Sequence, residues 1–137
     1  MTSETAEIED RLLSELHESG EEELVTLLNT VFDCTGEVSE RTAFCLAMIS
    51  LIETGAIAVA RESEGRPLKE MPRSRSIEQV KLAISALMFD IGERYWIDPQ
   101  MTFDVYAVVS SAGSERAHRI LSERGYQWWR RPEPCAK

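Results

Sequence analysis

The stretch "RTAFCLAMISLIETGAIAVA", residues 41–60, places an apolar helical pattern directly before an apolar alternating one. Over residues 40–54, apolar side chains occur on nearly every side of the expected helix, which is typical of a helix buried in a core or lying between two partners. Gly55 ends this helix, and β-branched residues alternate over residues 56–60 as in a short strand. The stretch therefore predicts a central core helix followed by one strand of a sheet.

Two amphipathic helices are expected before this stretch, over residues 7–19 and 21–32. The second begins with Glu21, Glu22 and Glu23, and the helix dipole favours negative side chains in a first turn. We expect this first turn to face the solvent. The pattern therefore predicts three exposed carboxylates at the start of the second helix.

Helices and strands alternate after residue 60. The segment "SIEQ", residues 76–79, has the spacing of a capping box and predicts a long helix that ends near Tyr95 and Trp96. The remaining expected elements are a strand at 101–110, a helix at 114–124 and a last strand at 126–131. Three helices followed by strand, helix, strand, helix and strand predict an α+β fold with a small sheet.

Length and composition suit a single globular domain, because the chain has 137 residues of which 43% are hydrophobic. We expect this domain to span residues 1–137, with 1–6 and 132–137 as loose termini. No apolar run reaches the roughly 18 residues of a membrane-spanning helix. The acidic N-terminus also lacks the basic and apolar regions of a secretory signal, which favours a cytoplasmic protein without membrane association.

No group of residues in the sequence predicts catalysis or metal binding. Cys34, Cys45 and Cys135 have no CxxC spacing, and His17 and His118 each stand alone. The sequence has no phosphate-loop, dinucleotide-binding or nucleophile-elbow motif. We therefore expect a protein that is not an enzyme and holds neither a cofactor nor a metal.

The charge distribution indicates a protein partner. Residues 1–55 carry 13 acidic and 2 basic side chains, whereas residues 56–137 carry 11 acidic and 13 basic ones. An acidic half repels phosphate backbones and attracts basic protein surfaces. The sequence therefore predicts a small protein-binding module, such as an inhibitor, an immunity-type partner or an adaptor, that docks an acidic helical face on a basic partner.

The candidate partner-binding residues are Glu21, Glu22, Glu23 and Trp129. Trp128 and Trp129 are adjacent on the expected last strand, so their side chains point to opposite faces. One of the two tryptophans is therefore expected to be exposed, and a Trp128 in the core leaves Trp129 at the surface. Exposed tryptophan is typical of an interface.

An alternative function follows from the basic segment "ARESEGRPLKEMPRSRS", residues 60–76. Its basic residues, which are the candidate nucleic-acid contacts, are Arg61, Arg66, Lys69, Arg73 and Arg75. Three helices, a strand and a basic loop resemble the order of elements in a winged helix over residues 7 to about 110. The resemblance implies a DNA-binding transcriptional regulator that uses residues 61–75 as a basic loop.

Two features of the sequence weaken this alternative. The resemblance implies that residues 40–54 are the recognition helix, but Arg41 is its one basic residue and few of its side chains could reach base edges. Glutamates are also interleaved with the basic residues of 61–75, and they offset phosphate contacts. We therefore expect this segment to be a flexible, solvated connection.

Overall fold

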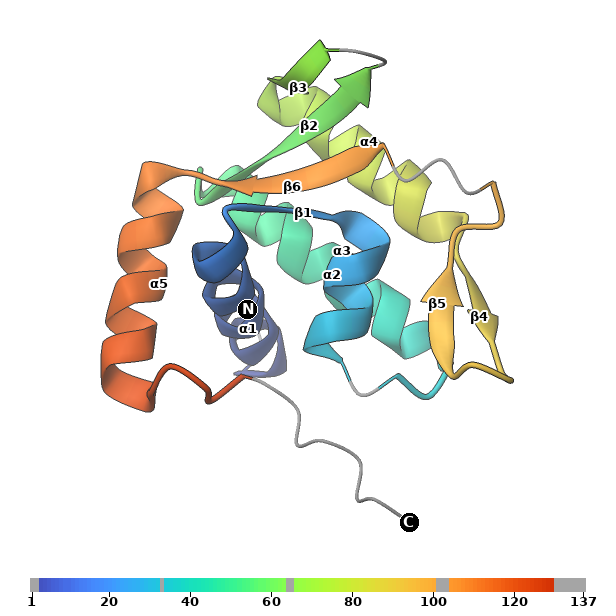
Figure 1. Ribbon diagram of the computed structural model, residues 1–137, viewed down its shortest axis with the longest axis horizontal. Helices are drawn as coiled ribbons and strands as arrows, with labels where there is room; N and C mark the ends of the chain where they lie inside the picture. Colours follow the sequence, from blue (N-terminus) through green and yellow to red (C-terminus); the bar gives the residue numbers. More distant parts are fainter. Residues whose placement is uncertain (1–2, 33, 64–65, 101–103, 130–137) are drawn as a thin grey trace.

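The computed structural model describes residues 3–32, 34–63, 66–100 and 104–129 of the chain. The helices are α1 (Ser3–Ser19), α2 (Leu24–Val31), α3 (Val38–Glu53), α4 (Arg73–Ser85) and α5 (Ser111–Arg124). The strands are β1 (Glu21–Glu23), β2 (Ile57–Ser63), β3 (Arg66–Glu70), β4 (Met88–Asp90), β5 (Tyr95–Ile97) and β6 (Val105–Val109). The predicted α+β class is confirmed, and Figure 1 shows α1, α2 and α3 packed beneath the larger sheet.

The larger sheet has the strand order β1-β6-β2-β3, and each neighbouring pair is antiparallel. Because β6 lies between β1 and β2, Ala107 is paired with Glu22 on one side and with Val59 on the other. Ala107 and Val59 are fully buried, so their face of the sheet lies against the helices. Strands β4 and β5 form a separate two-stranded sheet.

Helix α3 is the central core helix that its apolar pattern predicts. Its buried side chains are Phe44, Ala47, Met48, Leu51 and Ile52. It packs against α1, α4 and β2, so three different elements cover it. A helix in this position has to be apolar on several sides, which explains why its sequence shows no single hydrophobic stripe.

The helix predicted over residues 21–32 is shorter, because its first three residues form β1. Gly20 adopts a φ of 81° and turns the chain after α1, and a left-handed conformation of this kind favours glycine. The main chain of Glu21–Glu23 then pairs with β6. The acidic side chains suited a helix start, but the open edge of β6 provides hydrogen bonds that outweigh this local preference.

In the segment 61–75, which was predicted to be a flexible connection, the described residues form the end of β2, β3 and the start of α4. Strand β2 continues to Ser63, β3 pairs with it, and α4 begins at Arg73. Ser76 is therefore not an N-cap: it is buried inside α4, where its hydroxyl donates to the carbonyl oxygen of Met71 and accepts from the amide of Val59. The hydrogen bond with Val59 fastens α4 to β2, and the one with Met71 holds the residues just before α4.

The long helix predicted to end near Trp96 stops at Ser85, and β4 and β5 follow. Phe89 packs edge-on against Trp96, with 5.4 Å between the ring centroids. The side chain of Asn29 also holds the main chain of Trp96 through both its N–H and its carbonyl oxygen. Apolar residues of this hairpin follow the spacing of the preceding helix, which is why the helix was predicted to continue. Ile91 belongs to that apolar stripe but is 83% exposed, so it is not a core residue.

The elements of the C-terminal part begin and end at other residues than the sequence predicted. Helix α5 begins after Ser110, whose hydroxyl accepts from the amide of Gly113, and it ends at Gly125 as expected. Residues 126–129 form turns and not the predicted strand. At the other end α1 begins at Ser3, so residues 3–6 are helical, whereas the predicted loose segment 132–137 lies outside the described residues.

Candidate binding cleft

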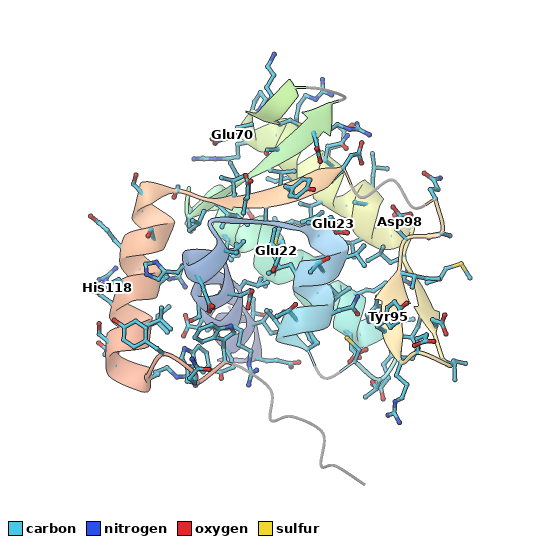
Figure 2. The ribbon with its side chains drawn as sticks, viewed as in Figure 1. Glu22, Glu23, Glu70, Tyr95, Asp98 and His118 are labelled. Atoms are coloured by element: carbon cyan, nitrogen blue, oxygen red, sulfur yellow. The ribbon has the colours of Figure 1, made fainter. Side chains whose placement is uncertain are left out.

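A cleft of about 380 Å³ lies between the start of α2, the second half of α4 and the residues that join β5 to β6. Its apolar lining consists of Leu24, Val25, Leu82, Ala83, Ile84, Ala86, Leu87 and Val105. Its carboxyl groups come from Glu23, Asp98 and Asp104, and Arg61 also lines it. Figure 2 shows Glu23 at the start of α2 and Asp98 near the end of α4. The cleft thus combines an apolar lining with an excess of negative charge.

Glu23 is the most buried of the three acids, with 9% of its surface exposed. One carboxylate oxygen, Oε2, accepts from the main-chain amides of Val25 and Thr26 and so caps α2. The other oxygen, Oε1, is buried and has no hydrogen-bond partner among the described residues. Burial raises the pKa of Glu23, and the nearby charges of Asp98 and Asp104 add to this effect.

The other two acids of the cleft differ in their partners. Arg61 donates from Nε to Oδ2 of Asp104 at 2.9 Å, and this ion pair is partly exposed. Asp98 accepts from the main-chain amide of Gln100 at 2.9 Å. No group of three metal-binding side chains occurs in the described part of the chain.

The predicted exposed acidic face of Glu21, Glu22 and Glu23 does not form. The three residues are a strand, so the side chain of Glu22 points to the side opposite Glu21 and Glu23, and only Glu21 is exposed. Glu21 is exposed at the edge of the sheet, and Glu23 enters the cleft. Figure 2 shows Glu22 on the helix side of β1, where it meets Glu15 of α1. Burial, reinforced by the adjacent carboxylate of Glu15, raises the pKa of Glu22 to about 8.

The raised pKa of Glu22 predicts a pH dependence of stability. Between its ordinary value of 4.5 and about 8, Glu22 is protonated in the folded chain but ionised in the unfolded chain. The folded state then binds the additional proton, so the free energy of unfolding should fall as the pH rises through this range. Urea denaturation across it should show this fall for the wild type and a flatter dependence for Glu22→Gln. An equal slope in both proteins would contradict the assignment.

The sequence offered Trp129 as a partner contact and left open which of the two tryptophans is exposed; Trp129 is the buried one, with only 2% of its surface exposed. Its indole N–H donates to Oε1 of Glu15 at 3.1 Å. Trp128 is the half-buried neighbour, and the guanidinium of Arg124 lies 3.4 Å from its ring centroid. The strand on which the prediction depended does not form, and turns after α5 bring both rings back to α1.

Much of the acidity of α1 is neutralised within the molecule. Arg124 of α5 forms two hydrogen bonds with the carboxylate of Glu7, at 2.9 and 3.0 Å. Arg116 lies 3.4 Å from Glu9 and 3.8 Å from Asp10. The side of α1 that carries these acids is therefore turned toward α5, and it is not a free face for a basic partner.

The residues predicted for nucleic-acid contact lie at the β2–β3 hairpin and the start of α4, which project from the rest of the fold (Figure 1). Lys69, Arg73 and Arg75 are exposed, and the side chain of Arg66 is outside the described part. Arg61 is held by Asp104 in the cleft wall. The open side of α3 carries Val38, Thr42 and Leu46, none of which is basic.

The two histidines and two of the three cysteines, Cys34 and Cys45, lie in the described part of the chain and outside the cleft. His17 and His118, which are far apart in the sequence, have ring centroids 6.3 Å apart, and His17 is hydrogen bonded to Ser114 at 3.1 Å. No third metal-binding side chain joins these two rings among the described residues. Burial raises the pKa of Cys45 and keeps its thiol protonated, so it is a poor nucleophile.

Comparison with protein-family models, with curated proteins and with solved structures gave no match. None of the helices in the described part is both long and apolar enough to cross a membrane. Function therefore has to be inferred from the cleft itself.

Proposed function

We propose that this protein is a small acidic binding module that docks on a basic partner protein through the cleft lined by Glu23, Asp98 and Asp104. The observation that carries the proposal is the lining of the cleft, in which three carboxyl groups lie beside apolar side chains and a single arginine. A basic side chain with an aliphatic stem matches both the charged and the apolar parts of this lining. The remaining candidates from the sequence, Glu21, Glu22 and Trp129, are outside the cleft.

The charge of the whole chain supports the same proposal. A formal net charge of −9 attracts a basic surface over a distance, which raises the association rate at low salt. Close to the protein, the apolar lining adds contacts that salt does not screen. A basic partner with aliphatic and cationic side chains therefore matches both the field of the protein and the lining of the cleft.

The binding test uses a peptide of alternating leucine and arginine, titrated by calorimetry. The wild type should bind this peptide, and Glu23→Gln combined with Asp98→Asn should weaken the affinity at least about 10-fold, since two charge-assisted contacts are lost. The control is Glu53→Gln combined with Glu123→Gln, which removes the same charge at exposed positions away from the cleft. Equal loss of affinity in both double variants would show that net charge alone attracts the peptide and would overturn the proposal.

A DNA-binding regulator remains the second candidate, because the β2–β3 hairpin follows three helices and presents basic side chains beside the start of α4. Duplex DNA at about 50 mM salt provides the test, since phosphate contacts are strongest at low salt. Nanomolar binding that is lost in Arg73→Gln combined with Arg75→Gln would favour the regulator over the protein-binding module.

A further inference from the structure

We infer that His17 and His118 together bind a divalent transition-metal ion such as Zn²⁺ in the hollow between the end of α1 and α5, with Ser114 as the residue that orients His17. This inference goes beyond the proposed function and does not depend on the cleft. It depends on three observations: the spacing of the two imidazole rings, the hydrogen bond on one of them, and the charge of the hollow.

The spacing of the rings is the first observation. Helices α1 and α5 pack side by side (Figure 1), which brings the last turn of α1 with His17 next to the middle of α5. Figure 2 shows His118 on α5, and the two ring centroids are 6.3 Å apart. Zn–N bonds are about 2.0–2.1 Å long, so two imidazoles on one zinc ion have their centroids roughly 5–6 Å apart. A small rotation of the side chains therefore suffices to place both rings on one ion.

The hydrogen bond of His17 is the second observation. Its Nδ1 lies 3.1 Å from Oγ of Ser114. When Nδ1 carries the proton and donates to this hydroxyl, the lone pair of the ring is at Nε2, which is the arrangement that metal-binding histidines usually have. His118 is exposed and has no hydrogen bond among the described residues, so its ring can turn toward the ion.

The charge of the hollow is the third observation. Glu115 also lines the hollow, and Glu18 directly follows His17, so negative charge lies close to both rings and favours a dication. Arg119 lines the hollow too and opposes this effect. Imidazole is a ligand that Zn²⁺, Ni²⁺ and Cu²⁺ prefer, whereas Mg²⁺ prefers oxygen. Because no third metal-binding side chain joins the rings among the described residues, water completes the coordination, and binding is weaker than in a structural zinc site with four protein ligands.

The test is a titration of the full chain with Zn²⁺, followed through the NMR signals of the two imidazole rings. Thiolates also bind zinc, so these signals and not the total amount of bound metal are the measurement. We expect both rings to shift together with one dissociation constant, and Mg²⁺ at the same concentration to shift neither. A shift of only one ring, or equal shifts with Mg²⁺, would overturn the inference.

Removal of one ring tests whether the two act as a pair. In His118→Gln, zinc binding at His17 should weaken at least about 10-fold, because the second contact to an ion already held is no longer available. The position is exposed, so the fold should survive the change. An affinity at His17 equal to that of the wild type would show that each ring binds zinc by itself, which contradicts the shared site.

Removal of the hydroxyl tests the orienting role of Ser114. Ser114→Ala should weaken zinc binding about 10-fold, the lower end of the usual effect of losing a hydrogen bond to a metal ligand. Ser114→Thr keeps a hydroxyl and should restore most of the affinity. Wild-type affinity in Ser114→Ala, or equal weakening in both variants, would show that Ser114 does not act through its hydroxyl and would overturn its assignment.

Arg119→Gln has the opposite expected effect, a gain in zinc affinity of about two- to fivefold, because it removes an exposed positive charge beside the ion. Misfolding cannot produce a gain, so this variant keeps the test meaningful even if another variant is destabilised. The matched control is Arg75→Gln, which removes the same charge at an exposed position outside the hollow and should leave the affinity unchanged. An equal change in both variants would contradict a site beside Arg119.

Discussion

Replacement of Trp129 by alanine is expected to lower the free energy of unfolding by about 3–5 kcal/mol, the range found for buried aromatic side chains. The indole is 2% exposed, and its loss leaves a cavity between the C-terminal turns and α1. It also leaves Glu15, which is itself buried, without the N–H that the indole donates. The cavity and the lost hydrogen bond both lower the free energy of unfolding.

Chemical denaturation of this variant beside Trp128→Ala provides the comparison. Trp128 is half-buried and contacts the guanidinium groups of Arg11 and Arg124, so its loss should cost only about 1–2 kcal/mol. Two adjacent residues of the same type thus have different expected effects. A smaller loss at Trp129 than at Trp128 would restore the arrangement that strand alternation predicted and would contradict the packing described for residues 126–129.

Gly113→Ala is expected to destabilise the fold by about 3 kcal/mol, at the upper end of the usual cost of overpacking. Gly113 lies in the first turn of α5, and a β-carbon there would overlap the carbonyl oxygen of Ala56 and lie 3.0 Å from Cγ2 of Val109. The carbonyl cannot simply move, because it already accepts from the amide and the hydroxyl of Ser110.

The direction of this effect is informative, because glycine inside a helix normally costs about 1 kcal/mol relative to alanine. Helix propensity alone would therefore predict that Gly113→Ala stabilises the protein. The control is Gly92→Ala, where the added β-carbon would meet only Oδ1 of Asp90, at 3.3 Å. We expect a change below about 0.5 kcal/mol at Gly92. Thermal and urea unfolding of the two variants would show whether the first turn of α5 lies as close to Ala56 as described.

The parts of the fold that were predicted correctly are those in which local pattern and packing agree. Helix α3 is apolar on several sides because three elements cover it, and its pattern could be recognised without knowing them. The strand after Gly55 and the stop of α5 at Gly125 have equally local signals. Such consistency between local preference and global structure is what makes a segment predictable.

The errors occurred where a distant partner decided the structure. Glu21–Glu23 form a strand because β6, from the other end of the chain, has an edge to pair with. Residues 88–97 leave the helical pattern because Asn29 and Phe89 hold Trp96 in a hairpin. Neither β6 nor Asn29 can be recognised as a partner from the spacing of the residues in these two segments. The helical periodicity was therefore the only signal available, and it predicted helix in both.

The candidate site was predicted only in part. Glu23 was chosen for its charge, but its burial and its place in the cleft follow from the pairing of β1 with β6. Asp98 and Asp104 were missed, because a loop carboxylate has no distinguishing signal until the fold brings it to other acids. The excess of basic residues in the second half of the chain was visible, but their pairing with α1 through Arg116 and Arg124 was not.

The position of β6 has a consequence for the order in which the molecule assembles. Strand β1 can pair only after residues 106–108 have been synthesised, so a growing chain that ends before β6 has β1 unpaired and one edge of β2 open. Pairing between such distant segments slows folding, and open edges of this kind favour association between chains in the meantime. Truncation before residue 105 should therefore yield an aggregating product, whereas a chain that includes β6 closes its own sheet.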